Sequence, residues 1–162
     1  MVPSTLMSQG TFDKFAALQD ELVKDYPRSS SGEIAGVFVP CAGQCLKDEG
    51  GIYYIGMGTH GPYKTDNDQT LAGCAEFAHT LCTGQIASDF WQFLDGLTLA
   101  VWGSRCGEIT ERWGWSNLFK IGWSRGNPSK GWPAPLLDRQ RELCTNALYE
   151  ELRNLRVRPG TS

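Results

Sequence analysis

Apolar residues recur at spacings of three and four in four segments of the chain, which is typical of amphipathic helices. The segments are residues 11–26, residues 69–82, the stretch between Ser88 and Gly103, and residues 134–155. Thr11 is the expected N-cap of the first helix and Pro27 its stop. The expected inward stripe of the last helix is Leu137, Cys144, Ala147, Leu148, Leu152 and Leu155.

Three shorter runs have the composition of strands. Residues 34–39 end at Pro40, residues 52–55 are apolar and β-favouring, and residues 113–122 mix apolar and polar positions before a loop. The order strand, helices, strand, long helix predicts an α/β fold. A parallel sheet needs a further strand after that helix, and none follows in these 162 residues. We therefore expect a short parallel sheet that is incomplete.

The composition fits one domain with a buried core, since 41% of the 162 residues are hydrophobic and 20% are charged. We expect a flexible lead over residues 1–9, a single domain over 10–156 and a tail over 157–162. The net charge of −3 argues against a protein that binds nucleic acid through charge alone. A local basic patch remains compatible with it.

The cysteines and the hydropathy pattern indicate a location inside the cell. The sequence holds six cysteines but shows no secretion signal, so we expect reduced thiols and a cytoplasmic protein. No apolar run approaches the roughly 20 residues of a membrane span. Six tryptophans and seven phenylalanines predict either a rigid aromatic core or a surface on which flat ligands stack.

The stretch from Gly51 to Tyr63 is the candidate functional loop. A short apolar strand there opens into a glycine-rich polar loop that includes Gly58, Thr59 and His60. Glycines allow a sharp turn and the close approach of another group, and sites of open α/β sheets lie where strands end. The alternative interpretation is an ordinary tight turn.

Two further segments carry candidate chemistry. Cys41 and Cys45 form a C-x3-C pair, and thiolates of that kind hold zinc or an iron–sulfur cluster; without a second close pair, two free thiols are favoured. Residues 123–133 are rich in glycine and proline and contain Arg125 and Lys130. They form the best candidate for a basic, aromatic loop that contacts nucleic acid, with a plain solvated loop as the alternative.

Three motifs in this order resemble the uracil-DNA glycosylase superfamily. The loop Ile55-Gly-Met-Gly-Thr-His-Gly-Pro-Tyr63 resembles the family's G-x-x-P-Y loop after its first strand. Ser116-Asn117-Leu118-Phe119-Lys120 resembles its [ST]-N-x-x-K signature. The helix Arg141-Glu-Leu-Cys-Thr-Asn-Ala-Leu-Tyr-Glu-Glu-Leu-Arg-Asn-Leu155 resembles E-x(2,3)-C-x(3)-L-x(2)-E-[LI]-x(2)-L. The similarity covers roughly residues 50–156.

This resemblance implies a three-layer α/β/α fold and hydrolysis of the bond between a base and its sugar in DNA, including single-stranded DNA. Enzymes of this kind take the base out of the stack and read its edge. It implies that Asn117 reads the base, that Gly58, Tyr63 and Lys120 also bind substrate, and that Thr59 and His60 occupy the catalytic loop. Arg125 and Lys130 remain the candidate nucleic-acid contacts.

Several departures from the family pattern predict weak or absent catalysis. The loop has Thr59 and His60 where the family often has Asp or Asn, and the late histidine motif has no counterpart here. The alternative is a non-catalytic module that binds nucleic acid or a protein partner. The edge strand of an incomplete sheet also favours self-association.

The resemblance extends in part to an iron–sulfur cluster. Some branches of the family hold a four-cysteine cluster, and Cys41, Cys45 and Cys144 resemble three of its ligands. The fourth position is Ile121, so a cluster would need a substitute ligand such as Cys106. We therefore expect no cofactor and no metal.

Overall fold

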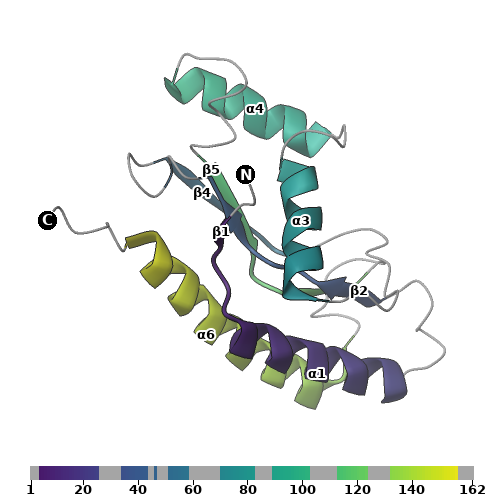
Figure 1. The fold of residues 1–162 in the computed structure, drawn as a ribbon. Coiled ribbons are helices and arrows are strands. Elements are labelled where there is room, and N and C mark those ends of the chain that lie inside the picture. Colours follow the sequence, from purple (N-terminus) through teal and green to yellow (C-terminus); the bar gives the residue numbers. More distant parts are fainter. Residues whose placement is uncertain are drawn as a thin grey trace, which may run out of the picture.

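The computed structural model describes residues 4–25, 34–43, 46, 51–58, 70–82, 89–102, 113–123 and 132–156. In chain order the elements are β1 (Ser4–Thr5), α1 (Gln9–Asp25), β2 (Ile34–Val37), β3 (Cys41–Ala42), β4 (Ile52–Gly56), α3 (Leu71–Cys82), α4 (Asp89–Trp102), β5 (Trp113–Asn117), β6 (Ile121–Trp123) and α6 (Ala134–Arg156). They confirm an α/β protein, with helices packed around small mixed sheets (Figure 1). Among these elements, no helix is both long and apolar enough to cross a membrane.

The main sheet is mixed, so the prediction of a parallel sheet was wrong in part. Its strand order is β1-β3-β5-β4, and only the β4–β5 pair is parallel. The chain between these two strands includes α3 and α4, as the long crossover of a parallel pair requires. Apolar patterning indicates which faces of a strand are buried, but it does not fix the direction of the neighbouring strand.

One of the predicted strands is divided between two sheets, and another is followed closely by a strand of the other sheet. The run predicted over 34–39 forms β2, and after Pro40 the chain continues as β3 in the main sheet. The run predicted over 113–122 likewise forms β5 in the main sheet and β6, which pairs antiparallel with β2. Proline has no N–H for ladder pairing, which explains the break after β2.

The apolar side chains form separate clusters, and Cys41 and Ala42 of β3 enter two different ones, on opposite faces of the main sheet. The largest cluster joins α1 and α6 to β2 and β6, and a second joins Phe38 and Trp115 to Ala78 of α3 and Leu94 of α4. Figure 1 shows α3 and α4 above the sheet and α1 and α6 below it. Val37 and Val39 belong to the first cluster and Phe38 to the second, as the alternation of side chains along an extended chain requires.

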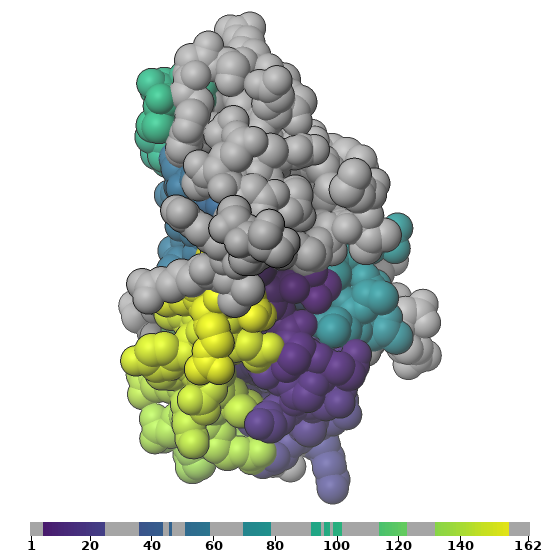
Figure 2. Space-filling model, turned by 60° about the vertical axis from the view of Figure 1, so that its left-hand side comes forward, coloured from purple at the N-terminus to yellow at the C-terminus, as the bar shows by residue number. Residues whose placement is uncertain are grey.

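The first helix begins earlier than predicted, and a carboxylate from the last helix lies at its N-terminus. α1 starts at Gln9, and the Thr11 amide donates to Ser8 Oγ over 3.3 Å, so Ser8 and not Thr11 is the N-cap. Glu150 of α6 accepts from the Ser8 amide at 2.7 Å and from the Thr11 hydroxyl at 2.6 Å. A carboxylate at a helix N-terminus is stabilising. Figure 2 shows α1 in purple and α6 in yellow lying side by side.

The predicted flexible lead over residues 1–9 is wrong for its second half. β1 pairs with β3, and Leu6 and Met7 are buried in two different apolar clusters. The Leu6 carbonyl also accepts a hydrogen bond from the Asn154 side chain at 3.1 Å. A two-residue strand is too short to show a periodic pattern, so the sequence gives little sign of it.

Candidate functional site

The parallel strands β4 and β5 end side by side, and their ends place the candidate residues together. Gly56 of β4 is in register with Asn117 of β5. The Leu118 amide donates to the Gly56 carbonyl at 2.7 Å, and the Phe119 amide donates to the Met57 carbonyl at 3.0 Å. The start of the glycine-rich loop is therefore fixed beside the S-N-x-x-K segment, at the edge where open α/β sheets bind ligands.

Asn117 lies at this edge with part of its hydrogen-bonding capacity unused. Its side chain is 2% exposed, and its Nδ2 has no hydrogen-bond partner among the described residues. The side chain also lies directly against Gly56, because a Cβ added to that glycine would lie 2.5 Å from Asn117 Oδ1. Gly56 thus provides the space that Asn117 fills. A buried amide without a partner is unusual and costly, unless a ligand supplies the partner.

Packed aromatic side chains lie next to this amide. The Trp115 Nε1 atom would lie 3.5 Å from the same added Cβ on Gly56, so the indole and the Asn117 amide share one neighbourhood. Trp115 packs edge to face on Phe38, with ring centroids 4.4 Å apart and planes at 64°. Tyr54 of β4 packs against the same cluster. The site therefore combines a polar amide with a rigid aromatic support.

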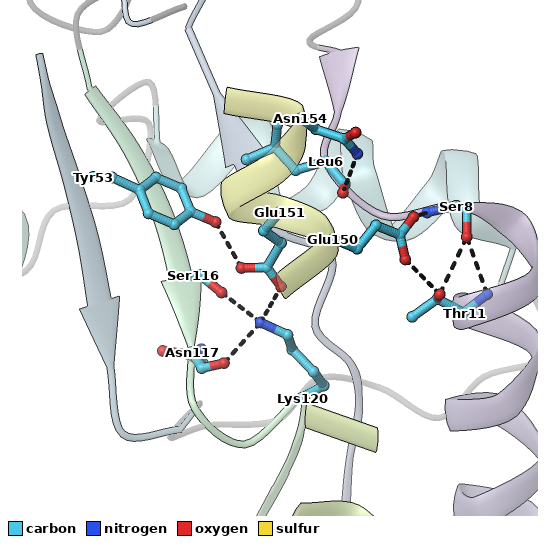
Figure 3. Close-up of polar contacts among 10 residues, drawn as sticks. All are labelled: Leu6, Ser8, Thr11, Tyr53, Ser116, Asn117, Lys120, Glu150, Glu151 and Asn154. Atoms are coloured by element: carbon cyan, nitrogen blue, oxygen red, sulfur yellow. Dashed lines mark hydrogen bonds and ion pairs between the residues drawn. The ribbon is translucent and has the colours of Figure 1, made fainter. Parts of the chain in front are cut away.

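Lys120 was predicted to bind substrate, but it lies inside the protein beneath the strand ends. Its side chain is 1% exposed, and its Nζ contacts Glu151 Oε1 at 2.6 Å and the Asn117 carbonyl at 2.8 Å (Figure 3). Nζ also donates to Ser116 Oγ. An ammonium has three donors, so these three acceptors satisfy it fully. No N–H donor of the ammonium is left for a substrate.

Glu151 completes a buried polar network that sequence reasoning missed. Its Oε2 accepts a hydrogen bond of 2.7 Å from the Tyr53 hydroxyl, on the side of the sheet that faces α6 (Figure 3). Burial raises the pKa of Tyr53, and the Glu151 carboxylate raises it further, so the phenol keeps its proton and donates. Burial lowers the pKa of Lys120, whereas attraction to Glu151 opposes that change.

The helical pattern of α6 contained the signal for this network. Cys144, Ala147 and Glu151 are spaced by three and four residues and are all buried, so Glu151 occupies a core position of the helix. Leu152, predicted to point inward, is 37% exposed instead. A carboxylate on the apolar stripe of a helix is rarely left without a partner. The position of Glu151 on this stripe therefore indicates a buried cation nearby.

An apolar groove of about 450 Å³ lies between α6 and the turn that follows β5. Its walls include Leu118, Phe119, Arg141, Leu148, Tyr149 and Leu152. Leu118 and Tyr149 are 44% and 68% exposed, and Met57, which follows β4, is 54% exposed. Large apolar side chains that gather on a surface indicate an interaction site.

The three cysteines whose side chains the structure describes, Cys41, Cys74 and Cys144, are buried or half-buried free thiols. Cys41 lies in the cluster around Trp115, and Cys144 lies in the cluster between α1 and α6. Burial raises the pKa of Cys144 to about 11 and that of Cys74 to about 11, so both are neutral thiols at pH 7. Within the described ranges, no three His, Cys, Asp or Glu side chains are placed to hold a metal ion. Cys45 lies outside the described residues.

Several predicted site residues also lie outside the described part of the chain. These are Thr59, His60, Tyr63, Arg125 and Lys130. Of the predicted substrate-binding residues, Gly58, Asn117 and Lys120 are described. Asn117 and the strand end that leads to Gly58 come together, and Lys120 lies beneath them.

The described elements define a class: a small α/β protein with an incompletely bonded amide at the end of a parallel strand pair, next to a glycine-rich loop. No family model, curated protein or solved structure matches the chain. Its function must therefore be inferred from this site.

Proposed function

We propose that this chain is a uracil-DNA glycosylase-like protein that binds a pyrimidine base of DNA at Asn117 and cleaves its glycosidic bond slowly. The observation that carries the proposal is the buried Nδ2 of Asn117, which has no partner among the described residues and lies where β4 and β5 end. The motifs around it, S-N-x-x-K and the glycine-rich loop, support the same site.

The chemistry of a carboxamide suits this role. Its NH₂ group donates and its oxygen accepts, in a fixed relative position. Uracil presents a carbonyl oxygen next to an N–H, so a single amide can satisfy both. Asn117 is almost fully enclosed, and a hydrogen bond made in such an environment is stronger than one made in water. A base removed from the stack is read by contacts of this kind.

We further infer that the described elements belong to a three-layer fold of the glycosylase type. The supporting features are the parallel β4–β5 pair, the helices between these two strands, and apolar clusters on both sheet faces. In this arrangement Asn117 and Gly58 lie on the loops that follow neighbouring strands. Such loops are where ligands bind in sheets with parallel strands.

The expected catalysis is feeble because the loop lacks a strong water-orienting group. Residues 56–63 include Thr59 and His60 but no carboxylate and no amide side chain. The absence of one positioned transition-state group typically costs about 10²–10³ in rate. Thr59 or His60 would then orient the water, with reduced efficiency.

A second candidate function is a non-catalytic binding module. The exposed apolar residues Met57, Leu118 and Tyr149 favour it, because they border the strand ends and the groove on α6. Such a module would keep the base-binding amide, or only the surface, and would associate with DNA or a protein partner. Binding without excision is its distinguishing property.

The test is single-turnover cleavage of uracil-containing single-stranded DNA with protein in excess, together with binding to the same strand carrying cytosine, whose edge has an acceptor and an amino donor where uracil has an N–H and a carbonyl. We expect slow excision over hours and a preference for uracil that Asn117→Ala abolishes. The matched control is Asn146→Ala, because Asn146 is an exposed asparagine of α6.

Three outcomes distinguish the candidates. Loss of the uracil preference in Asn117→Ala but not in Asn146→Ala supports the base-reading site. Uracil-specific binding without any product supports the non-catalytic module. Equal binding of uracil and cytosine strands by the wild type would overturn the base-reading site altogether. Binding that weakens with salt, and weakens further in Arg125→Ala and Lys130→Ala, would assign the DNA contact to their loop.

A further inference from the structure

We propose that Lys120, supported by Glu151, is a positioning residue of the Asn117 site, and that it holds the end of β5 so that the Asn117 amide stays against Gly56. This inference rests on the proposed base-reading role of Asn117. It differs from the role that the sequence motif suggests for the lysine, which is substrate contact.

The first support is the direction of the contacts that Lys120 makes. The chain leaves β5 at Asn117 and enters β6 at Ile121. Across this turn, Nζ of Lys120 reaches back to the Asn117 carbonyl at 2.8 Å and to the Ser116 hydroxyl. The backbone of the asparagine is therefore fixed on the side opposite to its own side chain.

The second support is that Lys120 is itself held rigidly from both sides. Its carbonyl accepts a hydrogen bond of 2.6 Å from the Phe38 amide. Its ammonium pairs with Glu151 at 2.6 Å, and Tyr53 orients that carboxylate from β4. The network thus joins α6, β4 and the end of β5 (Figure 3). A site residue is placed accurately when the groups behind it are locked by packing and hydrogen bonds.

The third support is the energetic nature of the pair. Both side chains are at most 1% exposed, and desolvation largely cancels the attraction of a buried ion pair. Two well-packed apolar side chains would stabilise the core as well or better. What the pair adds is accurate placement, because an ammonium that donates to three acceptors holds each of them in a defined position.

The decisive experiment compares Lys120→Met/Glu151→Gln with the wild type. The double variant keeps side-chain volume and leaves no unpaired charge, so it should unfold near the wild-type midpoint. The matched control is Arg139→Met/Glu21→Gln, which removes an ion pair of the same 2.6 Å length that is exposed at 51% and 40%. Binding to uracil-containing single-stranded DNA and the NMR signals of the Asn117 side-chain amide are measured in all three proteins. The signals are assigned by their loss in Asn117→Asp.

We expect the Asn117 amide signals to shift or broaden in the Lys120→Met/Glu151→Gln protein, and its uracil preference to fall about tenfold, as the loss of a charged hydrogen bond predicts. The control should change neither. Unchanged amide signals and an unchanged uracil preference would overturn the proposal and leave a purely structural ion pair. If the wild type shows no uracil preference, the amide signals alone still decide whether Lys120 positions Asn117.

Should the double variant fail to fold, Ser116→Ala provides the second test. It removes one of the three acceptors of Lys120 without leaving a charge. The same shift of the Asn117 amide, smaller in size, is expected from it. No shift in a folded Ser116→Ala protein would count against the positioning role.

Discussion

Substituting Gly56 by alanine should displace Asn117 at a modest cost in stability. The added Cβ would lie 2.5 Å from Asn117 Oδ1, which is about 1 Å inside ordinary van der Waals contact. Overpacking of this kind costs typically about 1–3 kcal/mol. The clashing atom ends a side chain that can rotate, so we expect the low end of this range, about 1 kcal/mol, together with loss of the uracil preference.

Gly114→Ala is the comparison variant, with a larger expected loss of stability. Its Cβ would meet the Cys41 carbonyl at 2.8 Å and carbon atoms of Leu46 and Tyr53 at 2.9 Å each. A backbone carbonyl in a sheet cannot rotate away, so the strands must separate. We expect a loss of about 3 kcal/mol or more. Gly96→Ala on exposed α4 meets nothing within 4 Å and should gain about 0.5–1 kcal/mol.

Urea denaturation gives the free energy of unfolding of each variant, and binding to uracil-containing DNA gives the functional effect. The two variants should differ: Gly56→Ala loses DNA binding but little stability, and Gly114→Ala loses stability. If Gly56→Ala were as stable as the wild type and kept its uracil preference, the placement of Asn117 against Gly56 would be wrong. An equal loss of stability in Gly56→Ala and Gly114→Ala would show that Asn117 cannot rotate.

Three further predictions test other parts of the structure. Glu150→Ala removes the carboxylate that caps α1 and should cost about 1 kcal/mol of unfolding free energy, whereas Glu142→Ala on the exposed face of α6 should cost little. Burial raises the pKa of Cys144 from 9.0 to about 11. The stability that the neutral thiol contributes is therefore complete below pH 9 and is lost as pH rises through 11. The unfolding free energy, measured under reducing conditions, should fall by at most about 2–3 kcal/mol over this range, and by less in Cys144→Ala. Anaerobically purified protein should contain no stoichiometric iron, because Ile121 replaces the fourth cysteine; about four irons per chain would contradict this.

The sequence predicted the elements that have long or uniform apolar patterns. α3 and α6 lie within about two residues of the predicted limits, and β4 begins at the predicted Ile52. The errors concern interactions between distant residues. Neither the cap that Glu150 provides to Ser8 nor the pairing of β1 with β3 follows from a local pattern. The N-cap was assigned to Thr11 because the apolar spacing begins at Phe12, whereas the helix begins one turn earlier and is capped by Ser8.

The sequence motifs indicated which segments lie together, but not how deeply Lys120 is buried. The S-N-x-x-K motif and the glycine-rich strand end do come together, as the register of Gly56 with Asn117 shows. Motif spacing could not reveal that Lys120 turns inward to Glu151. The two residues lie on different elements, and only the tertiary fold brings the charges together.

The contrast between neighbouring polar groups supports the proposed ligand position. Lys120 and the groups it contacts satisfy one another inside the core, yet the Asn117 Nδ2 next to them has no partner in the described structure. Trp132 Nε1 and Gln140 Nε2 are also buried nitrogens for which the described structure shows no hydrogen-bond partner. Gln140 uses its oxygen to fix the Ile121 amide at 2.8 Å, and Trp132 precedes α6, so neither lies at the ends of β4 and β5. Among the described residues, the Asn117 amide combines an unused donor with a strand end, a glycine at contact distance and a rigid aromatic neighbour. A ligand with an acceptor beside a donor would satisfy both polar atoms of that amide and remove the cost of leaving its donor buried without a partner.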